Sequence, residues 1–122
     1  MGKKILIVDD SKTFRQQLSF TLGKSGFEVI EAEDGVDGIA KLKATPGVAL
    51  IISDVNMPNM NGLEMLEAIK KDATFANLPV IMLTTEGGVE MIERAKKAGA
   101  KGWLVKPFQP DQLVSAATKM TA

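Results

Sequence analysis

Residues 3–11 read KKILIVDDS, an apolar run of branched side chains that ends at two adjacent aspartates. Three later stretches have the same character: residues 49–52, 80–83 and 103–105. Their hydrophobicity is continuous rather than alternating, which is typical of strands buried on both faces of a parallel sheet. Residues 27–32 alternate apolar side chains with glutamates, so we expect a fifth strand there, nearer the edge of the sheet.

Between these runs lie amphipathic segments of helical length, each marked by residues, almost all apolar, that recur at helical spacing. These residues are Phe14, Leu18, Thr21 and Leu22; Val36, Ile39, Ala40 and Leu42; Leu63, Leu66 and Ile69; Met91, Ile92 and Ala95; and Leu113, Ala116, Ala117 and Met120. Gly26, Gly47 and Gly99 follow three of the segments, where a left-handed residue commonly ends a helix. The alternation predicts an α/β fold, a (βα)5 flavodoxin-like doubly wound parallel sheet with strand order 2-1-3-4-5, as a single domain over residues 1–122.

The composition excludes several classes of function. The 122 residues carry 15 Lys plus Arg and 15 Asp plus Glu, so no net positive charge favours nucleic acid. Cys and His are absent, which excludes disulfides, thiol nucleophiles and imidazole-ligated metals, so any metal must be bound by oxygen. The apolar runs are far shorter than the roughly 18 residues that a membrane span needs. We expect a cytoplasmic monomer without membrane insertion and without a nucleic-acid partner.

Polar side chains follow the predicted strands, at the sheet edge where open parallel sheets bind ligands. Asp9 and Asp10 follow the first strand and Asp54 the third. A lone aspartate here is commonly a turn residue that caps the next helix. Two adjacent carboxylates with a third nearby repel one another, and Mg²⁺ would neutralise them because it prefers hard oxygen ligands. The backbone carbonyl of Asn56 could complete this metal site.

Asp54 opens the stretch DVNMPNMNG, residues 54–62, which is longer than a simple turn requires. A carboxylate can act as a covalent nucleophile toward phosphorus, and Asp54 follows a central strand. The Thr84 hydroxyl could bond a phosphoryl oxygen; the alternative is a β-branched residue that only ends a strand. Lys106 precedes Pro107, which holds it extended, and its ammonium could contact the phosphate unless it is an ordinary solvated lysine.

Taken together, residues 5–11, 54–58, 82–84 and 99–108, with Gly62, resemble two-component response-regulator receiver domains, and in particular the stand-alone regulators of chemotaxis. The resemblance covers essentially the whole chain. It implies that an acceptor aspartate receives a phosphoryl group from a phosphohistidine on a partner histidine kinase, with Mg²⁺ as cofactor.

The resemblance also implies roles for individual residues. Asp54 is the acceptor, and Asp9, Asp10, Asp54 and the Asn56 carbonyl bind Mg²⁺. Thr84 and Trp103 form a coupled switch, although position 103 is more often Tyr or Phe in the family. Asn56 and Glu86 tune the lifetime of the acyl phosphate; the alternative for Glu86 is a solvated loop residue. A downstream target protein binds the face of the fourth helix, fifth strand and fifth helix.

We therefore expect a single-domain response regulator of chemotaxis or motility, not an enzyme beyond its own phosphorylation and dephosphorylation. One alternative is a phosphorelay intermediate that passes its phosphate to a histidine phosphotransfer protein. Another is a Mg²⁺-dependent aspartyl-phosphate phosphatase, which is disfavoured because Asn56 stands where a second carboxylate is needed. A flavin-binding protein is disfavoured because Asp9 and Asp10 would repel the flavin phosphate.

Overall fold

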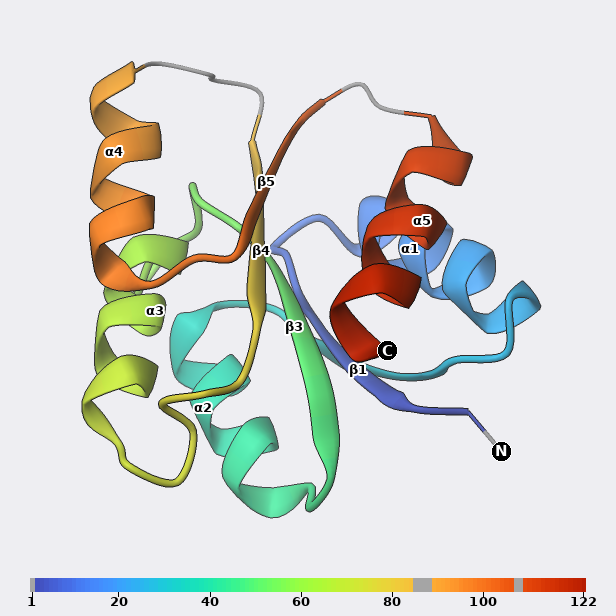
Figure 1. Ribbon diagram of the computed structural model, residues 1–122, viewed down its shortest axis with the longest axis horizontal. Coiled ribbons are helices and arrows are strands. Elements are labelled where there is room, and N and C mark those ends of the chain that lie inside the picture. Colours follow the sequence, from blue (N-terminus) through green and yellow to red (C-terminus); the bar gives the residue numbers. More distant parts are fainter. Residues whose placement is uncertain (1, 85–88, 107–108) are drawn as a thin grey trace.

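The computed structural model describes residues 2–84, 89–106 and 109–122, in which strands and helices alternate (Figure 1). In chain order the elements are β1 (Lys4–Val8), α1 (Lys12–Lys24), β2 (Glu28–Ala32), α2 (Gly35–Ala44), β3 (Val48–Asp54), α3 (Gly62–Lys71), β4 (Val80–Thr84), α4 (Val89–Ala98), β5 (Gly102–Val105) and α5 (Pro110–Thr121). The strands form one parallel sheet of order β2-β1-β3-β4-β5. The predicted fold class and strand order are therefore confirmed.

The sheet separates two layers of helices. Helices α2, α3 and α4 cover one face, and α1 and α5 cover the other (Figure 1). Alternate residues of the inner strands point to opposite faces, so Leu6 packs in the first core and Ile7 in the second. Both side chains are fully buried, as continuous hydrophobic runs predict. Within the described residues no helix is both long and apolar enough to span a bilayer.

Side chains at the sheet edge fix where two of the helices begin. Helix α1 begins after Ser11, whose hydroxyl accepts the N–H of Phe14 at 3.2 Å. Helix α3 begins after Asn61, which accepts the Glu64 N–H at 2.8 Å while the Glu64 carboxylate accepts the Asn61 N–H at 3.0 Å. These reciprocal bonds satisfy amides that a helix otherwise leaves unpaired. The loops that precede α1 and α3 are therefore anchored at their ends.

Helix α2 differs from its predicted apolar face. Val36 is 55% exposed and Ala40 is also exposed, whereas the buried side of the helix carries Gly35, Gly38 and Leu42. A Cβ added at Gly38 would lie 2.9 Å from the Met65 sulfur, so the helix packs too closely for a side chain. The prediction was right for Leu42 and for Ile39, which packs against the core, and wrong for Val36 and Ala40. It counted apolar residues only, whereas Gly35 and Gly38 make part of the contact surface of this helix.

Strand β5 also differs from the expectation of burial on both faces. Its residues are half-buried, and Val105 is 44% exposed. The strand pairs only with β4 and forms an edge of the sheet, so one of its sides has no neighbouring strand. The predicted left-handed glycines are confirmed at Gly26, Gly47 and Gly99, with φ of 94°, 83° and 103°.

Candidate functional site

Three carboxylates meet at the carboxyl edge of the sheet. Val8 of β1 pairs with Ser53 of β3, so the next residues, Asp9 and Asp54, lie side by side. Asp9, Asp10 and Asp54 each place a carboxylate oxygen within 4.8 Å of the others. Asp9 is buried, with 1% of its surface exposed, and 13% of the Asp54 side chain is exposed, whereas Asp10 faces solvent. The structure thus brings together all three aspartates that the sequence singled out.

Lys106 places its ammonium group between two of these aspartates. Its Nζ lies 3.3 Å from Asp9 Oδ2 and 3.8 Å from Asp54 Oδ2. The same Nζ lies 3.8 Å from the ring centroid of Phe14, a favourable distance for a cation–π contact. Sequence reasoning assigned Phe14 only to the apolar face of α1, and no local pattern links it to a lysine so far along the chain.

The aspartates are not explained by helix capping. Ser11 caps α1, and Asp9 instead accepts the Ser11 N–H at 2.8 Å through Oδ1. The Arg15 guanidinium donates to the Asp9 backbone carbonyl, which further fixes the turn after β1. The simpler reading is therefore wrong about the cap, which is Ser11, and right that Asp9 bonds the backbone of the turn two residues on.

The environment of Asp54 holds excess negative charge. Burial raises the pKa of the Asp54 carboxyl above its ordinary value. The positive charge of Lys106 lowers this pKa, and the negative charge of Asp9 raises it. Two smaller effects follow: the Val55 N–H, 2.8 Å from Oδ1, lowers the pKa, and the charge of Asp10 raises it. Three carboxylates accompany the one ammonium found here among the described residues, and clustered hard oxygen donors are the ligands that Mg²⁺ prefers. The donor set therefore fits this cation.

The loop after β3, residues 55–61, folds back on the strand that carries Asp54. The Val55 N–H donates to the Leu83 carbonyl of β4 at 3.2 Å, and the Gly62 N–H donates to the Val55 carbonyl at 2.9 Å. A Cβ at Gly62 would lie 2.1 Å from the Asp54 carbonyl oxygen, so only glycine permits this approach. Asn56 is exposed at the start of the loop, two residues beyond Asp54.

The two residues expected to form a switch lie on neighbouring strands. Thr84 is fully buried at the end of β4, one residue beyond Leu83, which pairs with Asp54. Trp103 lies on β5 opposite Met82 and packs against the core beneath α4. Its indole N–H is buried, and no described residue accepts a hydrogen bond from it. The expected role of Glu86 falls on a residue outside the described ranges.

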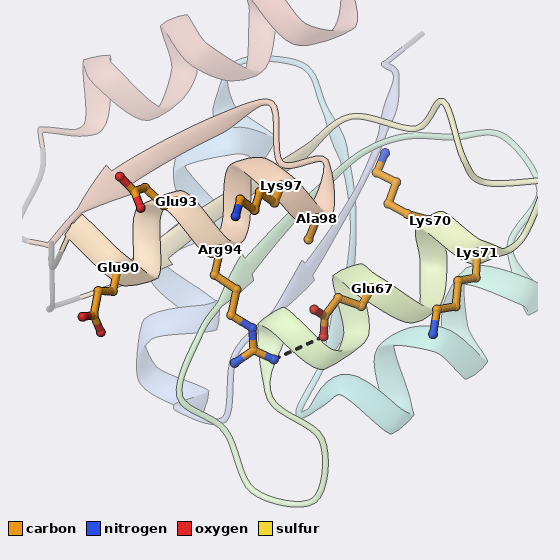
Figure 2. A pocket seen from close by; sticks show the side chains of 8 residues that line it. All are labelled: Glu67, Lys70, Lys71, Glu90, Glu93, Arg94, Lys97 and Ala98. Atoms are coloured by element: carbon orange, nitrogen blue, oxygen red, sulfur yellow. Dashed lines mark hydrogen bonds and ion pairs between the residues drawn. The ribbon is translucent and has the colours of Figure 1, made fainter.

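A hollow in the surface lies elsewhere, between α3 and α4 (Figure 2). It has a volume of about 650 Å³ and is lined mostly by charged side chains, with an ion pair of 3.2 Å between Arg94 and Glu67. Lys70 borders the groove but donates to the backbone carbonyls of Ala76 and Leu78. The groove contains none of the three clustered aspartates, so its size does not mark the chemical site.

Known proteins resemble this chain in both sequence and fold. Residues 5–118 match the response regulator receiver domain family. The chain is 45% identical over 111 residues to the chemotaxis protein CheY1 of Helicobacter pylori, covering 90% of each protein. It is 42% identical to a chemotaxis protein CheY homolog of Campylobacter jejuni, covering 90% of this chain and 85% of that relative. The structure of the Vibrio cholerae chemotaxis protein CheY4 matches with a TM-score of 0.92 and 42% identity, over 98% of this chain and 99% of that one.

Proposed function

This chain belongs to the response regulator receiver domain family and is of the chemotaxis CheY type, and from this membership we propose that it is a phosphorylation-dependent switch. The family consists of signalling proteins rather than classical enzymes. In the proposed function, Asp54 accepts a phosphoryl group from a partner histidine kinase. The modified protein then binds a downstream target in chemotaxis or motility signalling.

One observation carries this proposal: Asp54 lies at the end of a central strand, between the Lys106 ammonium and two further carboxylates. Lys106 Nζ is 3.8 Å from Asp54 Oδ2, and oxygens of Asp9, Asp10 and Asp54 lie within 4.8 Å of one another. Phosphoryl transfer depends mainly on positioning and on neutralising charge at the transferred group. The cluster supplies a nucleophile, a cationic side chain and oxygen donors for a metal at one place.

The chemical step proceeds by attack of an Asp54 carboxylate oxygen on the phosphorus of a phosphohistidine. An O–P bond forms as the N–P bond breaks, and the histidine nitrogen keeps the bonding electron pair and takes up a proton. The donor histidine lies outside these 122 residues, because they contain no histidine. Lys106 is placed to balance negative charge on the product, and the Thr84 hydroxyl is proposed to bond a phosphoryl oxygen.

Asp9, Asp10, Asp54 and the Asn56 carbonyl are the groups that we propose hold Mg²⁺. When bound, the cation neutralises charge on the phosphoryl oxygens as a Lewis acid. Asp9 is already oriented by the Ser11 N–H and by Lys106, so it needs little reorganisation to act as a ligand. Asp10, which is exposed, would offer a carboxylate oxygen to the cation from the solvent side.

Phosphorylation adds about −1.5 to −2 charges to the site, and the proposed response involves Thr84 and Trp103. Trp103 is the candidate relay because it lies on β5 beside α4, within the proposed target face of α4, β5 and α5. Asn56 and Glu86, each two residues beyond a site residue, are proposed to set the lifetime of the acyl phosphate. The proposal includes a cytoplasmic monomer as the working form.

The test uses Trp103, the single tryptophan, as a fluorescent reporter. Mg²⁺ and acetyl phosphate are added to the wild type, to Asp54→Asn and to the control Asp111→Asn, which alters an exposed carboxylate in the first turn of α5. We expect one phosphoryl group by intact mass spectrometry and a fluorescence change in the wild type and the control only. Equal phosphorylation of Asp54→Asn would refute Asp54 as acceptor.

A second assay separates the terminal switch from the relay. The protein, carrying a labelled phosphoryl group, is mixed with an unphosphorylated histidine phosphotransfer domain. Transfer of the label is followed from Asp54 to the histidine and in the reverse direction. Retention of the label on Asp54 until hydrolysis supports the terminal switch. Rapid transfer to the histidine domain supports the relay instead.

A further inference from the structure

Two hydrogen bonds tie the tip of the loop 55–61 to the N-terminus of α2. The Asn59 side-chain amide donates to Asp34 Oδ2 at 2.8 Å, although the two residues are 25 positions apart. The Gly35 N–H donates to the Met60 carbonyl at 3.0 Å. The loop that follows Asp54 is therefore fastened to α2, a helix that packs on β1 and β2, as well as to its own strand.

Asp34 is built to receive the Asn59 amide. It is 6% exposed, and its other oxygen, Oδ1, accepts the Asp37 N–H at 2.8 Å as the N-cap of α2. These two hydrogen bonds favour the ionised form and hold the pKa of the Asp34 carboxyl below its ordinary value. A buried carboxylate that accepts a hydrogen bond from its own helix with one oxygen and from a loop with the other is a rigid attachment point.

The backbone of Asn59 also requires explanation. Its φ is 66°, and among the described residues it alone adopts a positive φ without being glycine. Asparagine tolerates this left-handed conformation better than most residues, but glycine adopts it more easily. A glycine would be the simplest choice if the turn alone mattered. The side chain present instead makes the hydrogen bond to Asp34, which indicates that the tie itself is the useful feature.

The tie acts on the part of the loop that enters the site. Asn56 lies between Asp54, which ends β3, and the fastened residues Asn59 and Met60. Beyond them, the Gly62 N–H closes the loop onto the Val55 carbonyl at 2.9 Å. With both its ends and its tip held, the loop has little freedom to change the position of the Asn56 backbone.

We propose that Asn59 is a positioning residue for the cation site: through Asp34 it holds residues 55–61 in the conformation that suits a divalent cation bound by Asp54 and the Asn56 carbonyl. The inference rests on the proposed function, because it assumes that Mg²⁺ binds at this cluster. Asn59 contacts neither the cation nor the phosphoryl group. Its effect is on how much of the loop is already ordered before the cation binds.

Calorimetric titration of the full chain with MgCl₂ tests this inference, using Asn59→Gly. Glycine keeps the left-handed backbone available and removes only the side-chain tie. We expect the Mg²⁺ dissociation constant to rise about fivefold, below the range of about 10- to 100-fold seen for residues that contact metal ligands directly. In the Asp34→Ala background the same substitution should change the dissociation constant by less than about twofold, because the tie is already lost.

The control is Lys70→Met, which removes hydrogen bonds to the Ala76 and Leu78 carbonyls near the end of α3 away from the aspartates. It should lower the urea midpoint and leave the Mg²⁺ affinity unchanged, which separates positioning from general stability. Asn59→Gly with wild-type affinity would overturn this inference alone. Absence of Mg²⁺ binding in the wild type would overturn it together with the proposed cation site.

Discussion

Lys106 Nζ lies 3.3 Å from Asp9 Oδ2, although 97 positions separate the two residues. Asp9 follows β1 and Lys106 follows β5, and two strands, β3 and β4, lie between them in the sheet. The lysine side chain therefore reaches across the carboxyl edge and passes Asp54, 3.8 Å away. It is the internal counter-charge of the acidic cluster, and a bound cation would share that task with it.

Substitution of this lysine should destabilise the protein in a way that Mg²⁺ reverses. Lys106→Met leaves Asp9, 1% exposed, without its ammonium partner. We expect the free energy of unfolding in EDTA to fall by about 2 kcal/mol, below the range for fully buried pairs because the site is partly open. With saturating Mg²⁺ the loss should be smaller, because the cation compensates the same carboxylates. Urea unfolding with and without Mg²⁺ measures both values.

The matched control is Lys24→Met, which removes a lysine from the last turn of α1 that contacts only the exposed Phe20 ring among the interactions described. It should change stability by less than about 0.5 kcal/mol and show no dependence on Mg²⁺. A Lys106→Met protein as stable in EDTA as the wild type would contradict the role of counter-charge.

Asp54→Asn should stabilise the metal-free protein at neutral pH. The pKa of Asp54 is raised in the folded state by burial, so the folded protein binds this proton more tightly than the unfolded chain does. As the pH rises from the pKa of the unfolded chain to the raised pKa of the folded protein, the stability of the fold therefore falls. Above this pH range Asp54 is ionised in both states, and its charge destabilises the fold. We expect a gain of about 1 kcal/mol at pH 7 that shrinks as the pH is lowered through the window.

Chemical denaturation in EDTA at several pH values tests this expectation. Asp111→Asn serves as the comparison, since Asp111 is exposed on α5. A difference between Asp54→Asn and the wild type that does not vary with pH would argue against relief of a buried charge as the cause.

Two identical glycine substitutions should have opposite effects. A Cβ at Gly62 would meet the Asp54 carbonyl oxygen at 2.1 Å, whereas a Cβ at Gly23 of α1 meets nothing within 4 Å. We expect Gly62→Ala to lower the free energy of unfolding by about 2–3 kcal/mol and to slow phosphorylation. Gly23→Ala should raise stability by about 0.5–1 kcal/mol. Thermal unfolding and acetyl phosphate labelling of both variants measure these effects. A Gly62→Ala protein with wild-type stability and phosphorylation rate would show that the loop can move away from β3.

Mg²⁺ itself should stabilise the folded chain through the acidic cluster. At 100 times its dissociation constant, a ligand that binds only the folded state adds about 2.7 kcal/mol. Asp10→Asn should reduce this stabilisation while having little effect in EDTA, since Asp10 is exposed. Differential scanning fluorimetry over a Mg²⁺ series is sufficient. Equal shifts in Asp10→Asn and the wild type would place the cation away from Asp10.

Much of the fold was predictable because apolar runs report burial directly. The runs beginning at Ile5, Ala49 and Val80 became the three central strands, and the residues that follow them met at one edge as parallel strands require. The surface of α2 was not predictable in this way. At Gly38 the close contact depends on Met65 of another helix, and a single sequence does not state which helices touch.

The same limit applies to the site. Asp9, Asp54 and Lys106 were found because Asp54 ends a strand and the other two directly follow one. Phe14 and Asn59 were missed as site neighbours, since their contacts are with Lys106 and Asp34, which are distant in the chain. Asp34 carried one local clue, its position just before a helix, but that clue indicates a cap and says nothing of the loop it holds.

The position of β5 at the edge of the sheet has a mechanical consequence. An inner strand is hydrogen-bonded along both sides, whereas β5 is bonded only to β4, so displacing it breaks fewer bonds. Lys106 leaves the end of this strand for the acidic cluster, and Trp103 projects from its middle toward α4. A force on the Lys106 side chain therefore acts on β5, one of the two edge strands, which are the easiest strands of the sheet to displace. Trp103 belongs to the same short strand and would move with it.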